Sequence, residues 1–176
     1  VEHGCQALEA GCHVLSEVPG AYTQEECMRL RATVESTGKT YMLGENTCYW
    51  DFFRYFRKWV QEDLFGPISI AEGEYIHYLP ATLRLPDSTG LTPSKAKAEG
   101  HTNTTPIWRA DQPPIQYLTH DLGPLLEVLD DRCVSVTCKS APYHCTEAPM
   151  RSDGQIAIFE TAKGALIKIM VTLSTR

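Results

Sequence analysis

The hydrophobic pattern of the chain changes its period once, near residue 67, and this change limits the possible folds more than any other feature. Before it, three segments with apolar residues at helical spacing alternate with two short apolar runs, 12–16 and 40–43. Such alternation predicts a parallel sheet covered by helices. After it, residues 68–78 alternate between two faces, and apolar runs at 156–161 and 165–173 flank a turn. This second pattern predicts a mostly antiparallel sheet.

Local signals place several helix ends. Thr23 and Glu26 form a capping box that begins one helix, and Gly38 ends it. We expect Asp51 to cap the next helix. The apolar face of that helix comprises Phe52, Phe56, Trp59, Val60 and Leu64. A later helix carries a leucine stripe made of Leu122, Leu125, Leu126 and Leu129. Residues 80–114 have no periodicity, and a connection of that length is either functional or disordered.

We divide the chain at residue 66 and expect an α/β fold class. Residues 1–66 are predicted to form the C-terminal half of a Rossmann-type dinucleotide-binding domain with a parallel sheet. None of the 12 glycines forms a G-x-G pair, so the phosphate-binding loop of such a domain is absent. Residues 67–176 are predicted to form an α+β domain with a mostly antiparallel open sheet. We therefore expect the chain to be a fragment of a longer protein.

The bulk properties argue against two classes of partner. The formal net charge is -6 and no run of Lys and Arg occurs, which argues against nucleic-acid binding. No apolar stretch approaches the length needed to cross a bilayer. The N-terminus lacks the basic start and the apolar core of a signal peptide. We expect a cytoplasmic protein with no nucleic-acid partner and no membrane partner.

The chain has seven cysteines, an odd count, and no CxxC motif. This scatter favours reduced, mostly buried thiols in a cytosolic protein. Cys138, His144 and Cys145 are a possible metal set, because thiolate and imidazole are zinc ligands. Two of the three are adjacent and no matching second pair occurs, so we favour structural thiols and expect no metal site.

Residues at two strand ends and one histidine are the first candidates for cofactor binding and catalysis. Glu17 and Asn46 follow the two predicted parallel strands, at the edge where open α/β sheets bind ribose hydroxyls. His120 begins the leucine-striped helix, whose positive dipole end should keep the imidazole neutral and able to accept a proton. A histidine that only caps the helix is the alternative interpretation.

Other aromatic and basic side chains could join such a site. Tyr75 and His77 share one face of the predicted strand and could hydrogen-bond a sugar hydroxyl or move a proton, although rings on strands more often serve packing. Gly73 on that face leaves room for a ligand to approach the backbone. Tyr117 lies three residues before the candidate histidine. Arg109 could clamp a substrate oxygen or phosphate, and a solvated loop arginine is the alternative.

Six motifs together point to a known family by their order and spacing. They are HGCQALEAGCHVLSEVP, TQEEC, YMLGEN, LFGPISIAEGEYIHYL, WRAD and YLTHDLGPLLEVL. With them the chain resembles the Gfo/Idh/MocA oxidoreductases over nearly its whole length. Val18 stands where dehydrogenases of that family have a lysine that assists proton transfer. Gln116 stands where they have an aspartate four residues before the active-site histidine, and residues 113–115 replace their glycine triplet.

At the positions where it departs from the dehydrogenase pattern, the chain resembles the NAD-dependent glycoside hydrolase branch of the same family. That branch has a Glu-Val pair, a Glu-Asn-x-Cys-Tyr stretch, a Gly-x-Tyr-x-His strand and a Tyr-Pro-Thr-His turn. The corresponding segments here are residues 17–18, 45–49, 73–77 and 117–120, with Leu118 in place of the proline.

The resemblance implies NAD or NADP as the cofactor and a sugar-type small molecule as the substrate. It places the cofactor beside Glu17, Val18, Asn46 and Tyr117. It places the substrate beside Tyr75, Arg109, Tyr117, Leu118, Thr119 and His120. In this interpretation His120 and Tyr75 are the catalytic proton-transfer groups.

The activity that the resemblance implies is an NAD(P)-dependent oxidoreductase acting by hydride transfer. In a first alternative, a glycosidase oxidises the sugar, eliminates the leaving group, adds water and returns the hydride, without the paired carboxylates of ordinary glycosidases. A second alternative is a non-catalytic binding or assembly fragment, because the phosphate-binding loop is absent. The resemblance also implies a homo-oligomer built through the exposed face of the β-rich half.

Overall fold

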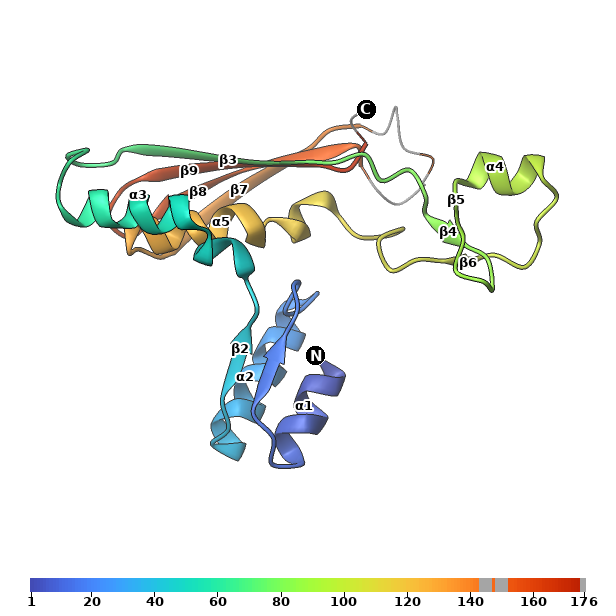
Figure 1. Ribbon diagram of the computed structural model, residues 1–176, viewed down its shortest axis with the longest axis horizontal. Coiled ribbons are helices and arrows are strands. Elements are labelled where there is room, and N and C mark those ends of the chain that lie inside the picture. The colour runs from blue at the N-terminus through green and yellow to red at the C-terminus, as the bar shows by residue number, and fades with distance from the viewer. Residues whose placement is uncertain (143–146, 148–151, 175–176) are drawn as a thin grey trace.

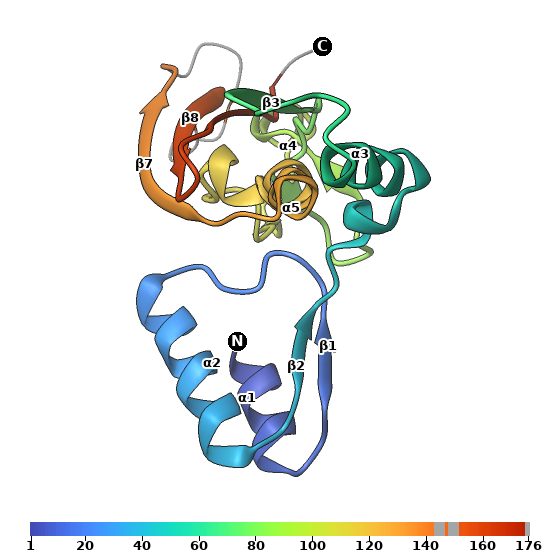
Figure 2. The same cartoon turned by 90° about the vertical axis from the view of Figure 1, so that its left-hand side faces the viewer.

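The computed structural model describes residues 1–142, 147 and 152–174, which form two units and a projecting arm (Figures 1 and 2). The first unit contains α1 (Glu2–Glu9), β1 (Val14–Ser16), α2 (Gln24–Thr37) and β2 (Tyr41–Leu43). β1 and β2 pair in parallel, as the helix–strand alternation predicts. Both helices lie on one side of the two strands (Figure 2). Their small core is made of Cys5, Leu8 and Leu30.

The ends of α2 follow the local sequence signals. Thr23 Oγ1 accepts a hydrogen bond from the Glu26 backbone N–H at 3.2 Å, and the Glu26 carboxylate accepts one from the Thr23 N–H at 3.3 Å. Gly38 ends the helix with a φ of 64°, in the left-handed region that favours glycine. Both predictions for this helix are confirmed, because a helix terminus depends only on hydrogen bonds between near neighbours in the chain.

The second unit is a four-stranded sheet with two helices on one face (Figure 1). The strand order is β3-β9-β8-β7, where β3 and β9 pair in parallel and the other two pairs are antiparallel. The predicted mostly antiparallel sheet is therefore confirmed. The strands are β3 (Ile70–Ile76), β7 (Cys133–Ser140), β8 (Gly154–Thr161) and β9 (Leu166–Thr172). The helical elements are η1 (Asn46–Tyr49), α3 (Asp51–Gln61), η2 (Pro114–Tyr117) and α5 (Thr119–Leu129).

One face of this sheet holds the main core. Ile167, Ile169 and Val171 alternate along β9 and are fully buried. The leucine stripe of α5 packs against them, as the helical spacing of those leucines predicts. The opposite face of the sheet exposes a row of apolar side chains, namely Ile70, Ile76, Ile156, Ile158 and Leu166. We call this row the outer face.

The prediction that Asp51 caps α3 is wrong. The cap position is Trp50, and Asp51 is the first helical residue, where its carboxylate faces the positive end of the helix. The aromatic side chains of the helix pack on one another, and Phe52, Phe56 and Trp59 stay more than one-third exposed. α3 contacts α5 of the second unit. The predicted domain boundary at residue 66 stays a prediction.

Residues 80–113, which lack periodicity in the sequence, form an ordered arm (Figure 1). It contains a three-stranded antiparallel sheet and a short helix: β4 (Leu83–Arg84), β5 (Gly90–Leu91), α4 (Pro93–Ala98) and β6 (Thr105–Pro106). The Ile107 N–H donates to the Thr82 carbonyl at 3.0 Å and closes the arm at its base. The disordered alternative for this segment is therefore wrong.

No helix in the described part of the chain has both the length and the apolar character that crossing a membrane requires.

Candidate active site

Three residues singled out in the sequence meet under the sheet, although they come from three different elements. Tyr75 lies on β3, Tyr117 ends η2, and His120 lies in the first turn of α5. The ring centroids of Tyr75 and Tyr117 are 5.1 Å apart, and those of Tyr117 and His120 are 5.2 Å apart. The rings of Tyr75 and His120 stack at 5.8 Å. We call Tyr75, Tyr117 and His120 the ring cluster.

Basic and aromatic side chains of the arm extend this cluster. The Arg109 guanidinium carbon lies 4.8 Å from the ring centroid of Tyr117 and 4.6 Å from that of Trp108. A cation over two ring faces is held in place by electrostatic attraction to both. The His77 ring lies 4.4 Å from that of Tyr75. Arg109 is therefore fixed beside the cluster, as a clamp for a polar ligand requires.

Gly73 explains how α5 comes close enough to β3. A Cβ added at Gly73 would lie only 2.8 Å from Cβ of Asp121 and 3.1 Å from Cδ1 of Ile169. The strand therefore accepts the first turn of α5 directly against its backbone. The sequence interpretation that Gly73 makes room for a ligand is wrong, because the helix fills that room.

Glu45, which follows β2, connects the first unit to His120. Its side chain is 10% exposed, and Oε1 accepts hydrogen bonds from the Thr47 N–H at 3.0 Å and the Thr47 hydroxyl at 2.6 Å. The same oxygen lies 2.9 Å from Nδ1 of His120. Burial opposes ionisation of this carboxyl, but the hydrogen bonds from Thr47 and His120 outweigh it and lower the pKa of Glu45. Glu45 therefore carries a negative charge beneath the imidazole.

Asp121 and Tyr75 hold their protons more strongly than usual. Burial raises the pKa of Asp121 to about 6, with the nearby charges of Glu45 and Glu74 adding to the effect and His120 opposing it. Oδ2 of Asp121 is buried, and it has no hydrogen-bond partner among the described residues. Burial, together with Tyr117, raises the pKa of the Tyr75 phenol. Tyr75 is therefore a neutral hydrogen-bond donor at pH 7.

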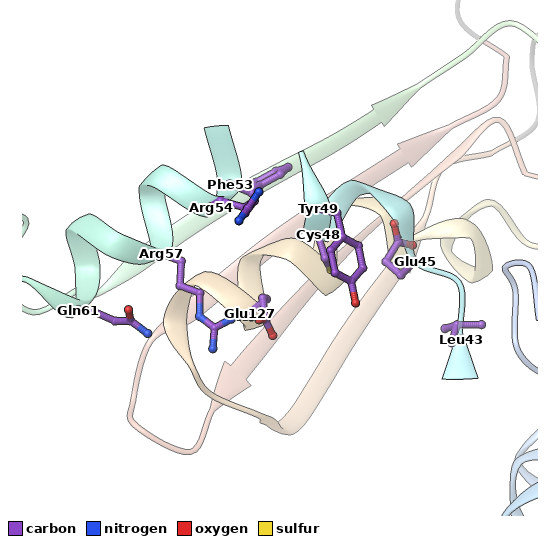
Figure 3. Close-up of a pocket in the computed structure, with 9 residues that line it drawn as sticks. All are labelled: Leu43, Glu45, Cys48, Tyr49, Phe53, Arg54, Arg57, Gln61 and Glu127. Atoms are coloured by element: carbon purple, nitrogen blue, oxygen red, sulfur yellow. Dashed lines mark hydrogen bonds and ion pairs between the residues drawn. The ribbon is translucent and has the colours of Figure 1, made fainter. Parts of the chain in front are cut away.

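Two pockets adjoin these groups. The first, about 460 Å³, is lined by Asn46, Thr47, Trp50, Phe52, Phe53, Glu74, Tyr75, His120 and Asp121. The second, about 650 Å³, lies between η1, α3 and α5 (Figure 3). Its lining contains an ion pair between Arg57 and Glu127, while Glu45 lies at the other end (Figure 3). Glu45 thus stands between the second pocket and His120.

The remaining predicted site residues lie at the strand ends or in the turn before α5. Glu17 is exposed and Val18 is half-buried, directly after β1. The Gly44 N–H donates to the Ser16 carbonyl at 2.7 Å, so the ends of β1 and β2 adjoin. Asn46 is exposed at the start of η1 and lines the pocket of Tyr75 and His120.

Two residues of the turn before α5 complete the predicted set. Leu118 packs against the sheet core, and Thr119 is the first residue of α5. The roles assigned to all these residues stay predictions.

Sequence reasoning missed the parts played by Glu45, Asp121 and Trp108. In the sequence Glu45 stands out only as part of the stretch 45–49, and no local pattern distinguishes Asp121 or Trp108. The contact of Glu45 with His120 spans 75 positions in the chain. A polar residue directly after a strand was the only local signal for Glu45.

The thiols do not follow the prediction that most are buried. All six cysteines described are free, and among them Cys5 is buried while Cys12, Cys27 and Cys138 are exposed. His144 and Cys145 of the alternative metal set lie outside the described residues. Within residues 1–142, 147 and 152–174, no group of three or more His, Cys, Asp or Glu side chains could hold a metal ion.

Comparison with curated proteins finds relatives that are named as glycosidases. The chain is 34% identical over 124 residues to an alpha-N-acetylgalactosaminidase of Bacteroides fragilis, which covers 70% of this chain and 27% of that protein. It is 31% identical to a glycosyl hydrolase family 109 protein of Shewanella pealeana, over 96% of this chain and 39% of that protein. The chain spans less than half the length of these relatives. No protein-family model matches the chain.

Solved structures share the fold. An inositol dehydrogenase homolog from Azotobacter vinelandii, complexed with NADH and myo-inositol, has a TM-score of 0.71 at 19% identity and covers 98% of this chain and 41% of its own. The WlbA dehydrogenase from Bordetella pertussis, in complex with NADH and UDP-GlcNAcA, has a TM-score of 0.72 at 19% identity, over 99% of this chain and 48% of its own. The predicted α/β fold class is confirmed.

Proposed function

We propose that the whole protein is an NAD(P)-dependent enzyme of the Gfo/Idh/MocA family that acts on a sugar, since glycosyl hydrolase family 109 proteins are among the relatives of this chain and sugar dehydrogenases share its fold. The observation that supports this most is the ring cluster beside Glu45. The neutral phenol of Tyr75 and the imidazole of His120 line one pocket, and the Arg109 guanidinium is held over the ring of Tyr117 beside them. Such groups bind hydroxyls and move protons.

The residues at the strand ends fit one half of a dinucleotide. Glu17 and Asn46 follow the parallel strands β1 and β2, and their oxygen and nitrogen atoms suit ribose hydroxyls and a carboxamide. Val18, Asn46 and Tyr117 would hold the nicotinamide side. The phosphates would have to be held elsewhere, because the chain contains no G-x-G pair. When bound, the cofactor supplies the hydride acceptor.

The chain's own residues would supply binding and proton transfer. Arg109, fixed over Tyr117, donates to substrate oxygens, and the turn from Tyr117 to His120 surrounds the sugar. His120 takes the proton of the sugar hydroxyl that is oxidised. Tyr75, neutral because of its raised pKa, donates a hydrogen bond to the same oxygen.

A retaining or inverting carboxylate pair is not needed for the alternative activity, glycoside hydrolysis by oxidation, elimination, hydration and reduction. Two observations favour this alternative: the named activity of the Bacteroides fragilis relative and the Val18 side chain, which cannot assist proton transfer. In this route the oxidised carbon acidifies the neighbouring C–H, and the hydride returns at the end.

The test is to incubate the whole protein with NAD and either an aryl α-N-acetylgalactosaminide or a set of free sugars. Aglycone release without net NADH would identify the glycosidase. Accumulation of NADH with a free sugar would identify the dehydrogenase. Neither signal, in a protein whose fold is verified by circular dichroism, would contradict both and leave a non-catalytic binding module.

Calorimetric titration of this 176-residue chain with NAD tests the division into domains that we propose. Residues 1–66 would be the C-terminal half of the dinucleotide-binding domain, and residues 67–176 the substrate-binding and oligomerisation domain. We expect weak or undetectable binding, since the phosphate-binding loop is absent. Tight binding would contradict this division.

We further propose that the protein works in the cytoplasm as a homo-oligomer. The free thiols of the described cysteines support a reducing compartment. The apolar row on the outer face supports contact with a second copy, because isolated domains rarely expose such a row. Sedimentation velocity should show an oligomer that Ile158→Glu dissociates. A monomeric wild-type protein would contradict this proposal.

A further inference from the structure

We propose that Glu45 is a positioning residue: it holds His120 in the form in which Nδ1 carries the proton and Nε2 accepts one. This inference rests on the proposed function for its consequence in catalysis. Its structural part, the state of one imidazole, stands independently of any activity. Neither the sequence motifs nor the names of the relatives assign this role to Glu45.

The hydrogen-bond geometry determines which nitrogen donates. Oε1 of Glu45 and Nδ1 of His120 are 2.9 Å apart, and the two side chains are only 10% and 17% exposed. A carboxylate has acceptors only, so the imidazole must be the donor. In a neutral imidazole one nitrogen donates and the other accepts, so Nε2 is left with a free lone pair. Nε2 has no hydrogen-bond partner in the described part of the protein.

Thr47 holds this carboxylate in place. Its backbone N–H and its hydroxyl both lie within hydrogen-bond distance of the oxygen that faces His120, at 3.0 and 2.6 Å. The Thr47 hydroxyl also lies 2.9 Å from the His120 carbonyl, so its single proton is shared between two acceptors, one on each side of the contact between η1 and α5. Gly123 allows this approach, because an added Cβ would lie 3.1 Å from Cγ of Glu45. The distance between Glu45 and His120 is therefore set by backbone contacts.

The charged groups around Glu45 leave His120 as its ion-pair partner among the described residues. Two arginines line the second pocket, and both have other carboxylates near them: Arg57 binds Glu127 (Figure 3), and Arg54 lies 4.0 Å from Asp51. The neighbouring thiol of Cys48 and carboxyl of Asp121 bring no positive charge, and Glu74 is the other titratable group facing Asp121.

Gln116, four residues before His120, supplies no carboxylate to the histidine. The dehydrogenase pattern has an aspartate at this position, four residues before the histidine. Here the Gln116 amide donates to the Tyr22 carbonyl at 3.1 Å and so joins the turn to the first unit. The carboxylate beside His120 comes instead from the end of β2.

The first test is the protonation of the two ring nitrogens, read by long-range proton–nitrogen NMR of the 15N-labelled chain at pH 8. We expect His120 to carry its proton on Nδ1 in the wild type. Glu45→Ala removes the acceptor and should shift the population toward the Nε2–H form, which free imidazole side chains prefer. Glu72→Gln, an exposed glutamate on β3, is the matched control and should change nothing. An Nε2–H signal in the wild type, or no change in Glu45→Ala, would overturn the inference.

Glu45→Gln covers the case in which the alanine variant does not fold. Glutamine keeps the volume and one acceptor oxygen, so the Nδ1–H form should persist while the negative charge is lost. In the whole protein, kcat should fall about 10-fold in Glu45→Gln and about 100-fold in Glu45→Ala, with KM changed less than about 3-fold. Glu45→Asp should recover part of kcat.

The two arms separate the inference from the proposed function. A raised KM with unchanged kcat would mean that Glu45 binds substrate, which overturns the positioning role. The expected NMR result in a protein without any turnover would refute the proposed function and leave the role of Glu45 in orienting His120 intact.

Discussion

The two faces of the four-stranded sheet are built from the same strands, yet one face is buried and the other is exposed. On the covered face, Ile167, Ile169 and Val171 are fully buried beneath α5. On the outer face, Ile158 and Leu166 of the same hairpin are more than 40% exposed. Alternation along a strand decides which residues share a face, but only the packing of another element decides whether that face becomes a core.

The covered face also carries the ring cluster of the candidate site. Tyr75 belongs to the buried side of β3 because it packs against the core beside Tyr117. Glu72 and Glu74 alternate with it and are exposed, and Glu74 at the edge of the sheet also borders the pocket of Tyr75 and His120. The candidate site therefore lies where α5 meets the sheet, and the following changes test the difference between the two faces.

The largest effect should come from a cavity in the covered face. Ile169→Ala removes buried methyl groups beneath α5 and should lower the free energy of unfolding by about 3–4 kcal/mol. Ile158→Ala, on the outer face of β8, should lower it by less than about 1 kcal/mol. Urea denaturation measures both. Similar losses would mean that the outer face is covered in solution.

A smaller effect should follow from adding one methyl group where α5 touches β3. Gly73→Ala places a Cβ 2.8 Å from that of Asp121, so helix and strand must separate, and stability should fall by about 2 kcal/mol. Gly4→Ala is the control, because its nearest neighbour lies at 3.7 Å and alanine favours the helix. Thermal unfolding distinguishes them, and a neutral Gly73→Ala would contradict the close contact.

The pH dependence of the free energy of unfolding should depend on the ionisation of the Asp121 carboxyl. Because its pKa is raised to about 6, the folded protein keeps this proton longer than the unfolded chain, and stability falls as pH rises from about 4 to 6. Asp121→Asn should remove that fall and add about 1–2 kcal/mol at pH 8, allowing for partial exposure. Asp87→Asn, whose carboxyl has a lowered pKa, should leave the fall in place.

The smallest effect is expected for an ion pair on the outer face. Lys168 Nζ and Glu72 Oε2 lie 3.1 Å apart between β9 and β3, and both side chains are at least one-third exposed. Lys168→Ala should change the free energy of unfolding by less than about 0.5 kcal/mol, because water and salt screen the pair. A double-mutant cycle with Glu72→Ala measures it. A coupling above 1 kcal/mol would indicate that the pair is buried by a second copy.

The elements that depend on near neighbours could be predicted from the sequence. The Thr23 capping box, the Gly38 terminus and the alternation of β3 each involve residues within a few positions of one another. The two-residue strands of the arm could not, since two residues show no periodicity. The cap of α3 was misplaced by one residue because Asp51 is also favourable in a first helical turn.

The candidate site likewise has features that could be predicted from the sequence and features that could not. Tyr75, Tyr117, Arg109 and His120 could be singled out as residue types, and the family resemblance grouped them. The contacts that fix their geometry could not be read from one sequence: Gly73 against Asp121 and Glu45 against His120 join distant segments. The reason for a glycine at position 73 can be recognised only when the residue that packs against it, Asp121, is known.

The hydrogen bond from the Ile107 N–H to the Thr82 carbonyl joins the two ends of the arm at its base. The chain leaves the sheet after Leu79 and re-enters the site at Trp108, and the bond between Thr82 and Ile107 joins the two borders of the arm. We therefore expect that the sequence between Thr82 and Ile107 can be shortened, lengthened or exchanged while the geometry of the candidate site is retained. For an engineer, the arm is the interchangeable part with which to change what the pocket admits.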